Sequence, residues 1–169
     1  MSRVISTEDI KELRARTSAG ISDCKDALIK TQGDIDAAVE ELKQLGRIIA
    51  EKKGGRAARE GVIESYIHHS KHVGVLLELN CETDFVARTD DFKQIAHDLA
   101  MQVAAMSPKF ISVDDIPEDE ILDPKQVCLM EQPFIKEPDK TVNELIIETI
   151  AKVGENIRIG RFSRFELGS

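Results

Sequence analysis

The feature that most constrains the fold is the alternation of apolar and polar residues along "VGVLLELNCE", residues 73–82. Apolar side chains occupy every second position, namely Val73, Val75, Leu77, Leu79 and Cys81. Successive side chains of a strand point to opposite faces, so this segment predicts one apolar face and one mostly polar face. Such a strand belongs in an antiparallel sheet that is packed on one side.

Two further segments complete a three-stranded antiparallel sheet. The stretch "GVIESYIHH" at 61–69 is rich in β-branched and aromatic residues and is joined to 73–82 by a short turn, "SKH". The segment "NIRIGRFSRFELG" at 156–168 predicts the last strand. Its alternation is imperfect, because Ile157, Ile159 and Phe165 share one parity and Phe162 has the other. A bulge near Gly160, or a partner that covers the second face, would each explain this.

Helices are expected to cover the apolar face of the sheet. Thr89 can cap a helix whose apolar stripe runs from Phe92 to Met106. Thr141 and Glu144 form a capping-box pattern ahead of a second helix that ends at Gly154. Between them, residues 107–140 hold all five prolines and predict loops with at most one short helix around 124–131.

The first 45 residues predict three short helices. Ser6 or Thr7 can cap the first, Ser22 the second and Asp34 the third. The third helix, "DIDAAVEELKQLG", resembles the last helix of ubiquitin-associated three-helix domains, and a partly helical connector with a hinge at Gly54-Gly55 follows it. The expected class is therefore α+β, with a helical domain at 1–54 and a core domain at 55–169. So small a bundle is suited to docking rather than to catalysis.

Composition and charge exclude several classes of function. No apolar run approaches the ~20 residues of a membrane span, and the N-terminal residues have neither a secretory nor a transit character, so a cytosolic location is expected. Residues 1–60 carry 12 basic against 11 acidic side chains, and the remaining residues give the chain its net charge of −8. An acidic body repels phosphate backbones, which argues against direct nucleic-acid binding.

The sequence indicates no catalytic residue, metal site or cofactor. His68 and His69 would point to opposite faces of a strand, and no helical metal-binding motif accompanies them or His72. Cys24, Cys81 and Cys128 are odd in number and lack a CxxC spacing, so we interpret them as reduced, buried thiols.

Phe85 stands where the strand ending at Cys81 gives way to the helix capped by Thr89. Two interpretations are open from the residues alone. Phe85 lies seven residues before Phe92, so a helix that began at Asp84 would place both rings on the core face. If Thr89 starts a fresh helix instead, residues 83–88 form a separate corner from which the ring projects toward a partner.

Four segments resemble the bacterial translation elongation factor Ts family. They are "ELRARTSAGISDCKDAL" at 12–28, "ELNCETDFVAR" at 78–88, "CLMEQPFIKEPDKTV" at 128–142 and "GENIRIGRFSRFELG" at 154–168. They follow in the family's order and span nearly the whole chain, which makes the resemblance far more specific than a single short motif.

The resemblance implies a guanine-nucleotide exchange factor. Members of this family bind elongation factor Tu in its GDP state, loosen the magnesium ion and release GDP. In this family a short wedge dislodges the magnesium ion, and the residues of this chain that match it are Thr83, Asp84, Phe85 and Val86. Those that match the docking surface on the GTPase domain of Tu are Arg14, Thr17, Gly20, Ile21, Ser22 and Lys25.

The chain departs from the family pattern in three respects. It has no room for the coiled coil and second core subdomain of the long members, the segment between Pro117 and Cys128 is shortened, and Ser22 replaces a usually apolar residue. A single-core factor of this type is expected to form a non-covalent homodimer through its last strand or its exposed sheet face. The competing hypotheses are a protein-interaction adaptor without exchange activity and a cysteine- or histidine-dependent enzyme.

Overall fold

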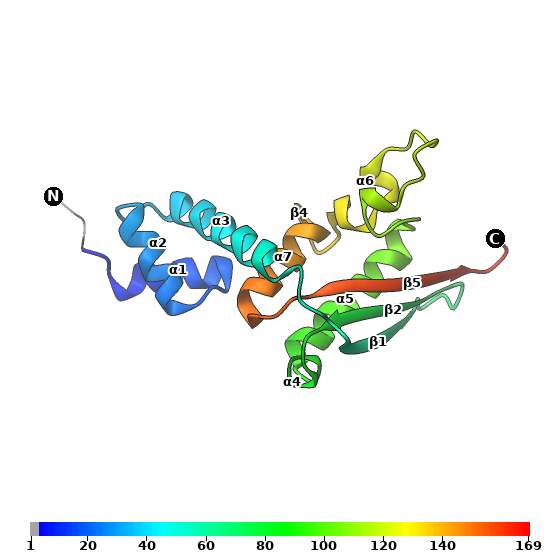
Figure 1. Ribbon diagram of the computed structural model, residues 1–169, viewed down its shortest axis with the longest axis horizontal. Coiled ribbons are helices and arrows are strands. Elements are labelled where there is room, and N and C mark those ends of the chain that lie inside the picture. The colour runs from blue at the N-terminus through cyan, green and yellow to red at the C-terminus, as the bar shows by residue number, and fades with distance from the viewer. Residues whose placement is uncertain (1–3) are drawn as a thin grey trace. The chain divides into compact units, whose positions relative to one another are not determined.

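The computed structural model describes residues 4–169, which form a mixed helix and sheet protein (Figure 1). Contacts divide the chain into two compact units. The first comprises the described residues up to Gly55 together with Ile147–Glu155, and the second comprises Arg56–Ile146 and Asn156–Ser169. The α+β class predicted from the sequence is confirmed. The inclusion of Ile147–Glu155 in the first unit had no signal in the sequence.

Three helices form the body of the first unit: α1 (Thr7–Thr17), α2 (Ile21–Lys30) and α3 (Ile35–Lys53). Ser6 caps α1 in a capping box with Asp9, and the Asp34 side chain accepts the N–H of Ala37 at the start of α3. Their apolar faces meet in one cluster, made of Leu13, Cys24, Ala27, Leu28, Ala38 and Leu42.

Two local predictions in this unit were wrong. Ser22 does not cap α2, because Gly20 is the N-cap and its carbonyl accepts the N–H of Cys24 at 3.0 Å. The third helix does not end at Gly46 but continues to Lys53. Glycine costs a helix about 1 kcal/mol relative to alanine, yet Gly46 is buried, and a Cβ there would lie 3.5 Å from the Ile147 side chain. The helix therefore continues through Gly46, where the backbone packs closely against the side chain of Ile147.

The second unit is built on the antiparallel sheet β1-β2-β5, with β1 (Glu60–Ile67), β2 (Val73–Cys81) and β5 (Arg158–Glu166). The long helix α5 (Asp90–Met106) packs against β1 and β2 (Figure 1). The buried residues of β2 are those at the alternating positions Val75, Leu77, Leu79 and Cys81. The three-stranded sheet with one covered face is therefore as predicted.

A β-bulge at Gly160 reverses the alternation of β5. The register with β2 shifts between Glu78 and Leu79, whose partners are Arg161 and Ile159, so Gly160 is the extra residue. Ile159 before the bulge is buried and Phe162 after it is half-buried, whereas Phe165 is 72% exposed. The bulge, rather than a covering partner, explains the parity of Phe162, and it is Phe165 that lies on the open face.

The segment between α5 and the last helix holds more structure than predicted. The short helix expected around 124–131 is present as α6 (Pro124–Val127) and the 3-10 turn η2 (Leu129–Glu131), and a further 3-10 turn, η1, spans Val113–Asp115. A small hairpin of β3 (Pro133–Phe134) and β4 (Glu137–Thr141) was not predicted, since its polar residues carry no alternation. The capping box of Thr141 and Glu144 opens α7 (Val142–Val153), as expected.

Buried amides hold this segment to α5. Gln102 of α5 is fully buried, accepts the N–H of Ile135 at 2.8 Å and donates to the carbonyl of Pro133 at 3.1 Å. Gln132 is also fully buried and donates to the carbonyl of Gln126 at 2.9 Å. Because polar groups buried without partners are costly, these paired amides specify one placement of the segment. No helix within residues 4–169 has the length and apolar character needed to cross a membrane.

Candidate functional site

The corner that follows β2 is a four-residue helix, α4 (Asp84–Ala87), whose side chains divide sharply between core and solvent. Val86 and Ala87 are buried, whereas the Phe85 ring is 79% exposed. The interpretation of Phe85 as a core residue is therefore wrong. The exposed ring on an anchored turn is a candidate contact residue for another molecule, because a few large side chains, aromatic ones prominent among them, carry most of the binding energy of protein interfaces.

Threonine caps separate α4 from the helix that follows. The Thr83 hydroxyl accepts the N–H of Val86 at 3.4 Å, and the Thr89 hydroxyl accepts the N–H of Phe92 at 3.3 Å while donating to the carbonyl of Val86 at 2.8 Å. Each N-cap residue has an extended backbone, which stops a single helix from running through both segments. Phe92 thus starts its own buried stripe, and Phe85 is left outside it.

The charged residues of the corner are paired with one another. Asp84 forms an ion pair with Arg88 at 2.8 Å, and the two side chains are 61% and 79% exposed. An exposed pair of this kind contributes about 0 to 1 kcal/mol. Asp84 can therefore exchange Arg88 for another cationic or hydrogen-bonding group at little cost.

A second exposed surface lies in the first unit, where α1 turns into α2. Ile21 is 60% exposed at the first position of α2, and the Arg14 guanidinium donates to the carbonyl of Ala19 at 3.3 Å. Ser22 and Lys25 are exposed on the same helix. Thr17 is half-buried and donates to the carbonyl of Leu13 at 2.8 Å, so its hydroxyl supports the turn. A Cβ at Gly20 would lie 3.0 Å from the Asp23 carboxylate, which favours glycine there.

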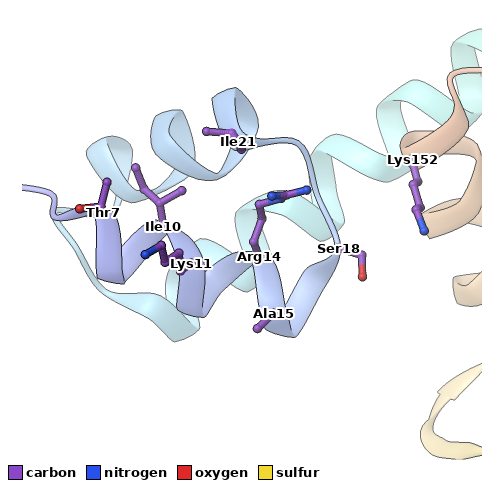
Figure 2. A pocket seen from close by; sticks show the side chains of 8 residues that line it. All are labelled: Thr7, Ile10, Lys11, Arg14, Ala15, Ser18, Ile21 and Lys152. Atoms are coloured by element: carbon purple, nitrogen blue, oxygen red, sulfur yellow. The ribbon is translucent and has the colours of Figure 1, made fainter.

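Arg14 and Ile21 also line an open groove of about 580 Å³ (Figure 2). Its remaining lining residues are Thr7, Ile10, Lys11, Ala15, Ser18 and Lys152. The lining surface is mostly apolar, and three of the lining side chains are cationic, namely Lys11, Arg14 and Lys152. A groove with this composition suits a partner segment that presents an apolar side chain beside a carboxylate.

The cysteine thiols, which are candidate nucleophiles, lie in the core. All three cysteines are buried reduced thiols, as predicted. Burial raises the pKa of the Cys24 and Cys128 thiols, which favours the unreactive protonated form. Within residues 4–169, no group of three or more His, Cys, Asp or Glu side chains is arranged to hold a metal ion.

The prediction that His68 and His69 point to opposite faces of a strand was wrong, because both follow the end of β1 at Ile67 and their ring centroids are 4.1 Å apart. The Tyr66 hydroxyl is 3.1 Å from Nδ1 of His68, and Nδ1 of His97 is 3.1 Å from the Glu64 carboxylate. The first pair joins β1 to the turn that follows it and the second joins β1 to α5, which is a role in packing.

Sequence reasoning located the exposed ring but missed residues that surround each surface. Ile10, Lys11 and Ala15 fall on one face of α1 with Arg14, so helical spacing alone was a usable signal for them. Lys152 comes from α7, far along the chain, and no local pattern indicates it. No local pattern indicates Asn156 either. Its backbone N–H donates at 2.7 Å to the carboxylate of Glu82, the residue directly before the corner.

Comparisons with known proteins agree along nearly the whole chain. The family model for elongation factor Ts matches residues 3–126. A protein named elongation factor Ts from Carboxydothermus hydrogenoformans is 48% identical over 195 aligned positions, which cover 98% of this chain and 90% of the relative. Proteins of the same name from Syntrophomonas wolfei and Thermotoga neapolitana are each 46% identical, covering 98% and 97% of this chain and 91% and 98% of the relatives. The chain belongs to the elongation factor Ts family.

Proposed function

We propose that this protein is the guanine-nucleotide exchange factor of elongation factor Tu. It binds Tu in the GDP state, displaces the magnesium ion and promotes GDP release during translation elongation, which places its action in the cytoplasm. It performs no covalent chemistry and needs no cofactor. The observation that carries the proposal is the 79% exposed Phe85 on a corner whose neighbours Val86 and Ala87 are buried.

The corner suits the mechanical step. Magnesium is held at about 2.1 Å by ligands in near-ideal octahedral geometry, so a small displacement of a ligand-bearing segment weakens it greatly. A phenylalanine ring inserted beside such a segment would push the segment aside and so disturb the positions of the magnesium ligands. Thr83 caps the corner, Asp84 is available through its exposed pair with Arg88, and buried Val86 acts as the anchor.

Docking is assigned to the helical part of the chain. We propose that residues 1–54 act as a docking domain and residues 55–169 as the core domain, with Arg14, Thr17, Gly20, Ile21, Ser22 and Lys25 contacting the GTPase domain of Tu. Arg14 and Ile21 line the apolar, cationic groove described above, which supports this assignment. Buried Val86 and half-buried Thr17 would contribute by holding the surface residues in place.

Exchange then follows from thermodynamic linkage. A factor that binds empty Tu more tightly than it binds Tu with GDP must lower the affinity of Tu for GDP by the same ratio. The protein therefore accelerates exchange in either direction and leaves the final distribution to the concentrations of GDP and GTP.

The test is the release of a fluorescent GDP analogue from elongation factor Tu. The wild-type protein is expected to accelerate release, and Phe85→Ala is expected to lose about 1 to 3 kcal/mol of this effect, or roughly 5- to 150-fold in rate, as at an interface hot spot. Ile121→Ala is the matched control, because Ile121 is a fully exposed apolar residue in a loop remote in sequence from the corner.

A wild-type protein without any acceleration would rule out the exchange function and would favour the adaptor hypothesis. If the activity required a cysteine or histidine but not Phe85, the enzyme hypothesis would replace it.

We also propose a non-covalent homodimer formed through the open face of the sheet. The pairing register places Ile67, Gly74 and Phe165 side by side across the three strands, with Leu76 one row further. Ile67, Leu76 and Phe165 are 56%, 51% and 72% exposed. Contiguous exposed apolar residues on a sheet face favour contact with another protein surface, and a second copy supplies a surface of the same character.

A further inference from the structure

Glu82 is the residue between the end of β2 and the Thr83 cap of the corner, and its carboxylate joins two distant segments. One oxygen accepts the backbone N–H of Asn156 at 2.7 Å, and the other lies 3.6 Å from the guanidinium of Arg56. The Glu82 side chain is 20% exposed, against 55% for Arg56. The hydrogen bond from the Asn156 N–H to the ionised carboxylate is charge-assisted, and such bonds are roughly twice as strong as those between neutral groups.

Asn156 closes the arrangement. It is 3% exposed, and its side-chain amide donates to the carbonyl of Arg56 at 2.8 Å. The three residues are far apart in sequence, with 74 residues separating Glu82 from Asn156 and 100 separating Arg56 from Asn156. The set is therefore a tertiary clamp and not a local turn motif.

The clamp stands at the two points where the chain enters the second unit. Arg56 is the first residue of that unit, and Asn156 is the first residue of its final segment. Glu60, a few residues after Arg56, pairs with Cys81 in the sheet. The residue directly before the corner is thus tied at once to the sheet and to both incoming segments.

The outer side of the corner is exposed to solvent, whereas its inner side packs against β1, β2 and α5. Thr83, Asp84 and Phe85 are all exposed, and only Val86 and Ala87 are buried. On the upstream side the Cys81 thiol lies 3.1 Å from the carbonyl of Thr83, which is a weak hydrogen bond. A rotation of the backbone at residue 82 would carry the Phe85 ring with it.

We propose that Glu82 is a positioning residue for the Phe85 corner: its carboxylate, hydrogen-bonded to Asn156 and ion-paired with Arg56, holds the backbone from which the ring meets its partner. This inference rests on the proposed exchange function and concerns how the corner performs it. A ring that is already held in one orientation loses less conformational entropy when it contacts its partner. Loss of the clamp should therefore slow the step that follows docking while leaving docking itself intact.

The experiment measures fluorescent-GDP release from elongation factor Tu across a range of factor concentrations, with the full-length chain. Glu82→Ala is expected to lower the maximal release rate about tenfold, as for a misplaced functional group, and to leave the half-saturating concentration within about twofold. Glu82→Gln keeps an oxygen that accepts the Asn156 N–H, so it should recover most of the lost rate.

A double-mutant cycle separates positioning from general damage. In a Phe85→Ala background, Glu82→Ala should lower the rate less than about twofold, because residues that act as one unit are not additive. Glu64→Ala is the matched control: Glu64 is also a half-buried, hydrogen-bonded carboxylate, 28% exposed and bonded to His97. It should keep the wild-type maximal rate within about twofold.

A Glu82→Ala protein that does not fold would be replaced by Arg56→Ala, which removes only the exposed partner. That variant should lower the maximal rate about two- to threefold, and only when Phe85 is present.

The outcomes are distinct. A wild-type protein that accelerates release, together with clamp variants that keep the full rate or that lower it equally without Phe85, would overturn the positioning role alone. A change confined to the half-saturating concentration would also overturn it. Absence of acceleration by the wild type would remove the exchange function and the positioning role with it.

Discussion

Two phenylalanines seven positions apart show that a single helix cap can decide whether a side chain is buried or exposed. Phe92 is fully buried and Phe85 is 79% exposed, although helical spacing would place both on one face. The Thr89 cap ends one helix and begins the next, so the two rings belong to different elements. Thr89 is visible in the sequence as a possible cap, but the sequence alone did not decide whether a new helix begins there.

The same substitution at these two positions should have opposite consequences. Phe92→Ala is expected to lower the free energy of unfolding by about 3 to 5 kcal/mol, because it leaves a cavity in the core. Phe85→Ala removes an exposed ring and should change it by less than about 0.5 kcal/mol. Urea unfolding followed by circular dichroism measures both values.

Equal losses for the two variants would contradict this assignment. So would a large loss for Phe85→Ala, which would mean that the ring is buried in solution. A stable Phe85→Ala protein is also the condition under which its loss of exchange activity can be interpreted.

At the scale of elements, agreement between sequence and structure depends on how local the determining interaction is. The hairpin of β1 and β2, the helix α5 and the capping box of α7 follow from alternation, helical spacing and caps, all of which act over a few residues. The hairpin of β3 and β4 was missed because Gln102 and Gln132 hold that region in place through contacts with residues elsewhere in the chain.

The bulge in β5 offers a test at this scale. Deletion of Gly160 would restore a continuous pairing with β2, which must turn the side chains on one side of the deletion to the opposite face. If the second half turns, Phe162 moves to the open face and Arg164 loses its two bonds to the carbonyl of Ala104, at 3.1 and 3.2 Å. The expected loss is about 3 kcal/mol or more in the free energy of unfolding.

Deletion of Ile121 is the control, because it also shortens the chain by one residue but lies in an exposed loop. It should cost far less than deletion of Gly160 in the same urea titration. Similar costs for the two deletions would mean that the bulge does not set which side chains of β5 face the core.

At the scale of the whole molecule, the question is what covers the open face of the sheet. We expect the wild-type protein to sediment at micromolar concentration with the mass of two chains. Leu76→Lys places a charge among Ile67, Leu76 and Phe165 and should shift the mass to that of one chain, since a buried unpaired charge opposes association. Ile121→Lys adds the same charge away from the sheet and should leave the dimer intact.

Reducing agents should have no effect on this association, because the three thiols are buried and none forms a disulfide. A wild-type mass of a single chain would contradict the dimer. A dimer that persists in Leu76→Lys would place the interface elsewhere.

What the sequence determined by itself was most of the local elements, the α+β class and the family, along with the corner that carries Phe85. The elements and the fold class follow from patterns within a few residues, and the family follows from sequence motifs that can be recognised without a structure. Only the tertiary structure decided that Glu82 is clamped by Arg56 and Asn156, that Lys152 joins the groove beside Arg14, and that Phe165 rather than Phe162 faces outward. The physical reason is that each of these outcomes depends on groups brought together across the fold, or on a register that one extra residue shifts, and neither is recorded in local periodicity.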